Sequence, residues 1–220
     1  MRVVVNAATS ADGKLSTRER RQVTISGPAD FDRVDELRAD SDAVMVGVGT
    51  VLADDPSLTV DSDERRAKRR ERGLPANPAR VVADSRLRTP PDAAVLDDEA
   101  PTYLLVSEAA PADWQRDMAE AGATVVAAGR ERVALGEAFD RLEDEGLDRL
   151  MVEGGGELIF SLFEEGLVDE LSVFVGPMVI GGRDAPTLAD GEGFLDEFPR
   201  LSLSDVRRID DGVLLRWTVP

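Results

Sequence analysis

Short apolar runs rich in β-branched residues recur along the chain and alternate with segments whose apolar positions have helical spacing. The runs are RVVVNAAT (2–9), DAVMVGV (42–48), RVVAD (80–84), TYLLVS (102–107), ATVVAA (123–128) and RLMVEG (149–154). Helices are predicted from Pro28 (with Phe31, Val34 and Leu37 on one face), over 112–121 before Gly122, and over 135–145. This alternation predicts a largely parallel sheet with helices on its faces.

The C-terminal part has a different pattern. LSVFVGPMVI (171–180), LSLSDVRRI (201–209) and GVLLRWTV (212–219) are predicted as strands without intervening helices. Asp211 and Gly212 are predicted to form a tight hairpin turn between the last two. The sheet is therefore expected to gain antiparallel strands on its C-terminal side.

The chain length, 220 residues, suits one α/β domain as well as two small ones, and we predict a single domain over residues 1–220. No stretch has the length and apolar character of a membrane span, and the N-terminus lacks the order of a signal peptide. A cytoplasmic protein without membrane association is expected. Cysteine and histidine are absent, so no metal site is predicted, and acid–base chemistry must fall to carboxylates, hydroxyls or lysine.

The charge balance is strongly acidic, with 44 Asp and Glu against 26 Lys and Arg and a net charge of −18. Such a surface repels nucleic acid and anionic membranes, so neither is an expected partner. Only two of the cations are lysines, and this composition leads to the hypothesis of a halophilic protein whose self-repulsion is screened by salt. The hypothesis predicts a stability that rises from dilute to molar KCl, and a flat or falling stability would contradict it.

One segment is basic. DSDERRAKRRERGLPANP (61–78) is predicted to be an exposed loop or short helix. A solvated connector is the favoured interpretation, and a contribution to holding an anionic ligand is the alternative.

Two segments carry candidate chemistry. In LMVEGGGELIFSLFEEGL (150–167) a strand ends in three glycines before an amphipathic helix, an arrangement suited to a pyrophosphate, although a simple tight turn is equally consistent. Glu153, at the end of that strand, is either a cap for backbone amides or a ligand contact. In RVVADSRLRTP (80–90) a hydroxyl and guanidinium groups follow a strand and could bind a phosphate monoester such as the 2′-phosphate of NADPH, although surface arginines are common. Asp12 and Gly13 are predicted to form a turn.

Together these segments resemble a known family. NAATSADGKL, LRADSDAVMVGVGTVLADDPSLTV, RVVADSRLR, LMVEGGGELIFSLFEEGLVDELSVFV and GGRDAPTLADGEGF are similar, in order and over essentially the whole chain, to the pyrimidine reductases of riboflavin biosynthesis. The archaeal and fungal members act on 2,5-diamino-6-ribosylamino-4(3H)-pyrimidinone 5′-phosphate. The resemblance implies a dihydrofolate-reductase-like α/β fold, a three-layer sandwich with a mixed, mainly parallel sheet and an antiparallel C-terminal edge. It also implies NADPH as cofactor, with NADH use left open, a small-molecule substrate and a homodimer.

The resemblance assigns site residues one by one. The strand through Val46 would deliver Thr50 and Asp54 to the nicotinamide end of NADPH. The diphosphate would lie along Gly154, Gly155, Gly156, Glu157 and Leu158, and the adenosine phosphate among Ser85, Arg86 and Arg88, with Val133 on the adenine side. The substrate would contact Asn6, Leu58 and Glu153, with Arg38 at its 5′-phosphate.

Two positions refine the assignment. Asn6 stands where bacterial bifunctional enzymes usually have lysine, and since an amide both donates and accepts, it suits an amino-bearing pyrimidine. The diamino substrate is therefore favoured over the deaminated one. Asp61 departs from the family, because bacterial relatives often have a phosphate-binding arginine there; either Arg38 acts alone or an arginine of the basic segment substitutes.

The implied reaction opens the ribosylamine to an imine whose C1′ accepts hydride from the nicotinamide. Ring opening needs a proton at the ring oxygen, and Asp54 is the first candidate donor, ahead of Glu153 or a bound water. The alternatives are a reductase for the deaminated pyrimidine, a related reductase for another pterin or pyrimidine, and, last, a non-catalytic NADPH-binding module.

Overall fold

The computed structural model describes residues 1–195 and 197–220, and these form two compact units. The first unit contains Met1 and residues 35–151, and the second contains residues 2–34 and 152–220. The division falls inside two elements, α1 (Pro28–Ala39) and β6 (Arg149–Glu153).

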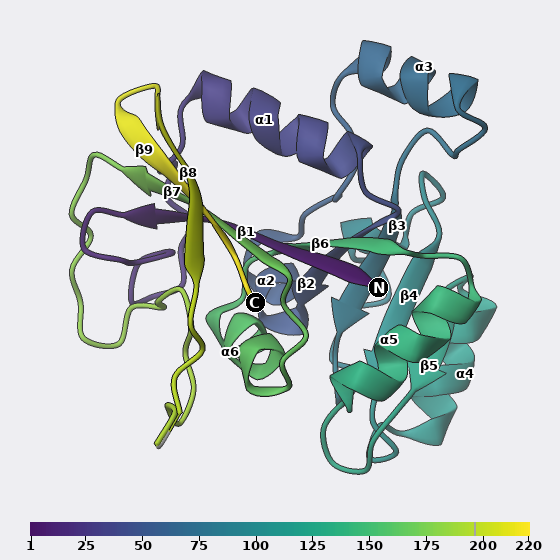
Figure 1. The fold of residues 1–220 in the computed structure, drawn as a ribbon. Coiled ribbons are helices and arrows are strands. Elements are labelled where there is room, and N and C mark those ends of the chain that lie inside the picture. The colour runs from purple at the N-terminus through teal and green to yellow at the C-terminus, as the bar shows by residue number, and fades with distance from the viewer. Residues whose placement is uncertain (196) are drawn as a thin grey trace. The chain divides into compact units, whose positions relative to one another are not determined.

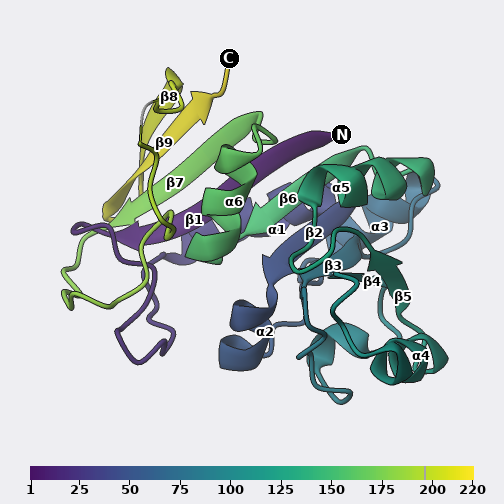
Figure 2. The same ribbon diagram turned by 90° about the horizontal axis from the view of Figure 1, so that it is seen from below.

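The first unit is built around parallel strands in the order β5-β4-β3-β2 (Figure 1). Its elements are β2 (Ala43–Gly47), α2 (Val48–Asp54), α3 (Asp63–Glu71), β3 (Ala79–Ala83), a 3₁₀ turn η1 (Ala94–Leu96), β4 (Thr102–Val106), α4 (Ala112–Glu120), β5 (Thr124–Ala127) and α5 (Leu135–Asp144). Val46 lies opposite Val82, which lies opposite Leu104, and all three are buried. Helices α4 and α5 contact β5, and α2 contacts β2 (Figure 2). Burial on both faces explains why these strands are almost uniformly apolar.

The second unit joins a parallel pair to an antiparallel hairpin. Its remaining elements are β1 (Arg2–Ser10), α6 (Gly156–Glu164), β7 (Glu170–Gly176), β8 (Ser202–Ile209) and β9 (Gly212–Thr218). Strand β1 pairs in parallel with β7, and β7 pairs antiparallel with β9, which pairs with β8. Ile25, Phe174 and Leu214 form a buried cluster on one face of this arrangement. The expected mixed sheet, mainly parallel with an antiparallel C-terminal edge, is confirmed.

Three local predictions need correction. The turn between β8 and β9 is formed by Asp210 and Asp211, with Asp210 in the left-handed region at φ 50°, while Gly212 already belongs to β9. Gly212 is required for close packing, since a Cβ there would lie 2.3 Å from Cζ of Phe174. The strand predicted over 171–180 ends at Gly176. Phe31, predicted on the apolar face of α1, is 53% exposed.

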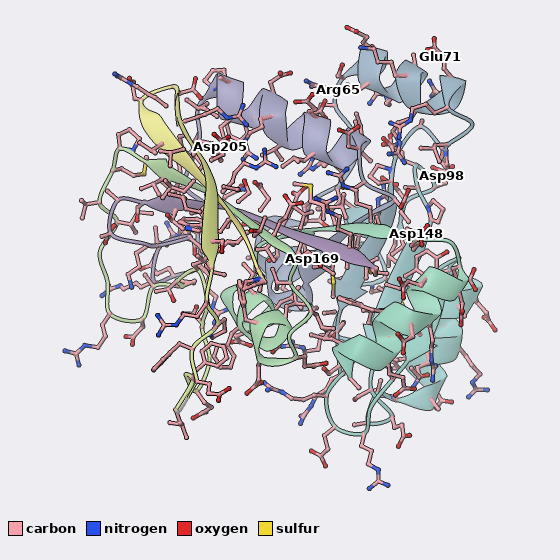
Figure 3. All side chains as sticks on the ribbon, in the orientation of Figure 1. Arg65, Glu71, Asp98, Asp148, Asp169 and Asp205 are labelled. Carbon is pink, nitrogen blue, oxygen red and sulfur yellow. The ribbon has the colours of Figure 1, made fainter. Side chains whose placement is uncertain are left out.

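The acidic residues lie largely in solvent. Glu71, Asp98 and Asp148 of the first unit and Asp169 of the second are all exposed (Figure 3). The Asp12 turn is one place where a carboxylate organises backbone: it accepts hydrogen bonds from the amides of Ile180 and Gly181 and from the Ser10 hydroxyl. The Ser10 hydrogen bond is the main cause that lowers the pKa of Asp12 to about 2.

None of the helices in the described part of the chain combines the length and apolar character needed to cross a membrane.

Candidate active site

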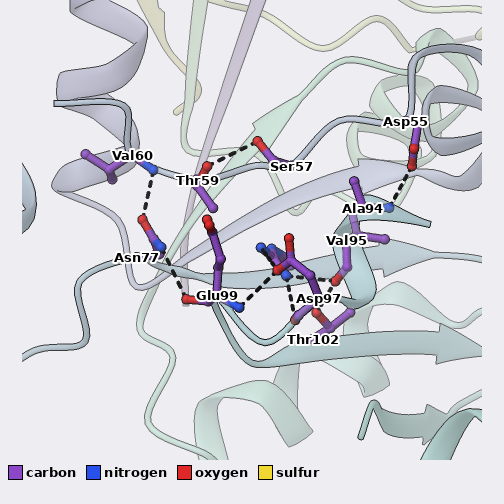
Figure 4. Close-up of polar contacts among 11 residues, drawn as sticks. Asp55, Ser57, Thr59, Val60, Asn77, Ala94, Val95, Asp97, Glu99 and Thr102 are labelled. Carbon is purple, nitrogen blue, oxygen red and sulfur yellow. Dashed lines mark hydrogen bonds and ion pairs between the residues drawn. The ribbon is translucent and has the colours of Figure 1, made fainter. Parts of the chain in front are cut away.

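In the first unit, strand β2 leads directly into the seven-residue helix α2, which carries Thr50 and Asp54. The helix ends because Asp55 takes the left-handed conformation at φ 42°, and its N–H donates to the Val51 carbonyl. The Asp55 carboxylate accepts the amide of Ala94 at 2.8 Å, which ties the end of α2 to η1 (Figure 4). Asp54 lies at the surface, yet the protein around it displaces enough water to raise the pKa of its carboxyl.

The chain after α2 turns sharply. Leu58 has φ 55°, a conformation that is rare for a side chain of this kind, and its side chain is only 1% exposed. The hydroxyls of Ser57 and Thr59 are 3.1 Å apart, and the Val60 amide donates to Oδ1 of Asn77 at 3.1 Å (Figure 4). Because the Leu58 side chain is buried in the core, a substrate contact at this residue would have to come from its main chain.

Arg38, in the last turn of α1, is half-buried and donates from Nη1 to the Thr59 carbonyl at 3.0 Å. The turn that follows Val60 is held by buried Asp35, whose carboxylate accepts the amides of Asp61 at 2.5 Å and Ser62 at 3.2 Å. The Asp61 side chain itself is exposed.

The basic segment contains the short helix α3. A short helix was one of the two structures predicted for this segment, and an exposed loop was the other. Three of its arginines hold the surrounding chain. Arg65 pairs with Asp35 at 2.8 Å, and Arg66 donates to the Val60 carbonyl at 2.6 Å. Arg69 is buried and donates to the carbonyls of Ala39, Ser41 and Pro75. These contacts give the three arginines structural roles, so a phosphate contact from this segment would fall to more exposed residues such as Arg70.

The turn after β3 brings several predicted phosphate-binding residues together. Arg86 and Arg88 are exposed beside half-buried Ser85, whose hydroxyl accepts the Val133 amide at 3.1 Å. The structure therefore joins Ser85 and Val133, which are far apart in sequence. Asp84 stabilises the turn, because its buried carboxylate accepts hydrogen bonds from the amide and the hydroxyl of Thr89 at 2.7 and 2.8 Å.

In the second unit, the glycine run forms the start of α6. Gly154 and Gly155 have φ 83° and 90°, which favour glycine, and a Cβ on Gly154 would project into open space. Gly156 instead allows a close chain approach, since a Cβ there would lie 2.5 Å from the Thr187 carbonyl oxygen. The first amides of a helix have no intrahelical acceptor, so those of residues 156–158 are suited to an anion.

The side chains around this run differ in what they can contribute. Glu153 is the last residue of β6 and is half-buried. Glu157 is exposed, with its carboxylate 3.9 Å from Arg20. Leu158 is buried, so at Glu157 and Leu158 the backbone amides are the groups suited to a diphosphate.

Asn6 lies on β1 and is 6% exposed. Its Oδ1 accepts a hydrogen bond from Nη2 of Arg33 at 2.9 Å. The amide oxygen therefore already accepts a hydrogen bond from Arg33. Asn6 is then expected to offer its N–H groups to the substrate, and not to accept from an amino group of the substrate. Sequence reasoning missed Arg33; the signal was the Asp30–Arg33 spacing of three residues on one helix, which is typical of an ion pair.

No group of three or more Asp or Glu side chains in the described part of the chain is arranged to hold a metal ion.

Comparison with models of protein families identifies the family to which this chain is related. The model of the RibD C-terminal domain matches residues 1–215. The chain belongs to this family. Among curated relatives of this chain, one from Archaeoglobus fulgidus is 50% identical over 210 residues, covering 96% of this chain and 94% of the relative. Another, from Methanothermobacter thermautotrophicus, is 46% identical over 220 residues, covering 99% and 97%. Both are named 2,5-diamino-6-ribosylamino-4(3H)-pyrimidinone 5′-phosphate reductase.

Solved structures agree on the fold of the RibD C-terminal domain. A pyrimidine reductase-like protein from Corynebacterium diphtheriae is 21% identical and has a TM-score of 0.84, covering 100% of this chain and 92% of that one. RibD from Acinetobacter baumannii is 25% identical with a TM-score of 0.79, covering 100% of this chain and 58% of that one. The expected dihydrofolate-reductase-like α/β fold is confirmed.

Proposed function

We propose that this chain is the NADPH-dependent reductase that converts the ribosyl group of 2,5-diamino-6-ribosylamino-4(3H)-pyrimidinone 5′-phosphate into a ribityl group, acting in the cytoplasm. The observation that carries the proposal is the 46–50% identity, over nearly the full length of both chains, to relatives that bear this reductase name. The match of the family model across residues 1–215 further supports the view that both units belong to one reductase domain.

The cofactor assignment rests on groups that fit each part of NADPH. The amides at the start of α6 and the open space beside Gly154 suit the diphosphate. Ser85, Arg86 and Arg88 offer a hydroxyl and two guanidinium groups in one turn, which suits the 2′-phosphate and supports NADPH over NADH. Val133, whose amide donates a hydrogen bond to the Ser85 hydroxyl, would lie on the adenine side. Thr50 and Asp54 of α2 would serve the nicotinamide end.

The proposed reduction needs a hydride, a proton for ring opening, and residues that position the substrate. Bound NADPH would supply the hydride that reduces C1′ of the opened imine. With no histidine in the chain, Asp54 is assigned the proton for ring opening, and partial burial raises the pKa of its carboxyl in the direction that a proton donor requires. Asn6, Glu153 and the main chain at Leu58 would hold the pyrimidine and ribose, and Arg38 the 5′-phosphate.

We further propose that the protein is a homodimer formed through the β8–β9 hairpin. Val213, Leu215 and Trp217 alternate along β9 and share a face, and Leu203 and Val206 lie opposite Trp217 and Leu215. A bulge between Leu203 and Asp205 keeps the β8 residues in phase with this face. Leu203 and Val206 are 58% and 55% exposed. An apolar strip of this kind on an outer strand suits a second copy of the chain.

Replacing Val206 with Asp is expected to convert the dimer to a monomer, because a carboxylate would be buried in the interface. Light scattering after size-exclusion chromatography measures the mass directly. Arg207→Asp is the matched control, since it places the same side chain on the opposite face of β8. A dimer that survives Val206→Asp, or a wild-type protein that is monomeric, would contradict this assignment.

The function is tested by NADPH oxidation at 340 nm in molar KCl, with the diamino pyrimidinone phosphate and its deaminated counterpart offered separately. Faster turnover of the diamino compound is the expected result. Preference for the deaminated compound would keep the reductase chemistry but reassign the substrate. Absence of oxidation with either, by folded protein, would contradict the proposal.

A further inference from the structure

A buried polar network surrounds Asn6 in the second unit. Arg33 of α1 donates from Nη2 to Oδ1 of Asn6 at 2.9 Å, from Nε to Asp30 at 2.8 Å and from Nη1 to the Ser172 hydroxyl at 3.3 Å. Asp30 is 1% exposed and also accepts the Ser26 hydroxyl at 2.5 Å. The guanidinium of Arg33 is therefore held by three protein groups, among them a carboxylate on its own helix.

This network fixes the orientation of the Asn6 side-chain amide. A guanidinium has only donors, so the atom of Asn6 that faces Arg33 must be the oxygen. The amide is planar, and its two N–H bonds must then point to the other side. The bond from Arg33 is the one hydrogen bond that the structure shows for this side chain in the described part of the chain. Asn6 is thus a nearly buried side chain whose N–H donors have no hydrogen-bond acceptor among residues 1–195 and 197–220.

We propose that Arg33 is a positioning residue that locks Asn6 into presenting donors only, so that Asn6 recognises an acceptor atom of the pyrimidine. The proposal rests on the proposed function and specifies its selectivity. In the diamino pyrimidinone, ring atom N1 carries a lone pair, whereas in the deaminated dione the same atom carries a hydrogen. A fixed N–H donor pairs with the first and opposes the second. Preference for the diamino compound would then come from ring N1 and not from the exocyclic amino group.

The decisive variant is Asn6→Asp. It is nearly isosteric and keeps an oxygen for Arg33, but it replaces the N–H donors with a second acceptor oxygen. We expect the ratio of kcat/KM for the diamino compound over that for the deaminated compound to fall about a hundredfold, because a buried donor–acceptor pair becomes two facing acceptors. The KM for NADPH should stay unchanged.

Arg33→Met tests the positioning role separately. Without the guanidinium, the Asn6 amide can turn either way, and we expect the same ratio to fall about tenfold. The double variant Asn6→Asp, Arg33→Met should show a strongly non-additive loss, since Arg33 acts through Asn6. A purely structural role for Arg33 would lower the thermal midpoint and both kcat/KM values together and leave the ratio unchanged.

Amide NMR gives a readout that does not depend on turnover. The chain has two asparagines and two glutamines, so the side-chain NH₂ signals of Asn6 can be assigned by their loss in Asn6→Asp. Saturation with the diamino compound should shift those signals in the wild-type protein and should shift them less in Arg33→Met. If both variants turn over with an unchanged ratio of kcat/KM for the two compounds, the inference about Arg33 and Asn6 is wrong, while the proposed function stands. The same holds if the pyrimidine binds without shifting the NH₂ signals of Asn6. Absence of turnover by the wild-type chain would overturn the proposed function and this inference with it.

Discussion

Replacement of Asp54 by asparagine is expected to lower kcat by about two to four orders of magnitude, the range typical of losing a general acid. The variant keeps the size of the side chain and its place at the end of α2 but removes the proton that ring opening requires. The affinity for NADPH should change little, because the amide can keep polar contacts to a bound nicotinamide. Single-turnover NADPH oxidation and a fluorescence titration of NADPH measure the two quantities independently.

Asp55→Asn is the matched control. Asp55 is the next carboxylate along the chain, but it accepts the Ala94 amide at 2.8 Å and has a structural role. This variant should lower the thermal midpoint slightly and keep kcat within a small factor. Equal losses in the two variants would indicate that the end of α2 tolerates no change, and unchanged turnover in Asp54→Asn would remove Asp54 from the reaction.

The pH profile provides a second check on Asp54. Partial burial raises the pKa of its carboxyl, so the protonated form persists to higher pH than for a solvated aspartate. If Asp54 is the proton donor, kcat falls as pH rises through that raised pKa, and this limb is absent from Asp54→Asn. A profile that keeps the same limb in the variant would assign the proton to another group, such as Glu153.

The strands were predictable because their residues face protein on both sides. Runs such as residues 43–47 and 79–83 are apolar at nearly every position, which is the pattern of parallel strands covered on both faces. The hairpin turn was misplaced by one residue because Asp-Gly is a strong turn signal. Close packing of Gly212 against Phe174, 38 residues away in sequence, decided the outcome. A local pattern carries no information on such a contact.

The candidate site was predictable where backbone conformation imposes glycine or a turn, as at Gly154 and Gly155. It was not predictable where one side chain acts through another. Arg33 and Arg69 appear in the sequence as ordinary surface charges of a helix, and only the fold shows that both guanidinium groups are enclosed by acceptors. Leu58 shows the converse case, in which a residue inferred to touch substrate has its side chain in the core.

Replacement of Arg80 by methionine is expected to destabilise the protein by about 3 kcal/mol. The Arg80 side chain is fully buried on β3, and Nη1 donates to the carbonyls of Val95 and Asp97, each at 3.1 Å. Nη2 pairs with the Asp97 carboxylate at 2.6 Å. Methionine fills much of the volume, so the loss arises mainly from the hydrogen bonds to the Asp97 carbonyl and carboxylate, while the Val95 carbonyl keeps the Thr102 hydroxyl as a donor. A decrease of about 6–12 °C in the thermal midpoint should result.

Arg116→Met is the control for Arg80, because Arg116 is 73% exposed and pairs with exposed Asp113 on α4. Exposed pairs contribute about 0–1 kcal/mol, so its midpoint should barely move. The Arg80 variant should also lose turnover at temperatures where it remains folded. Arg80 holds the segment around Val95, and the preceding residue, Ala94, donates to Asp55 at the end of α2. Loosening that segment frees the end of the helix that carries Asp54. A variant that is destabilised but fully active would show that η1 stabilises the fold without positioning Asp54.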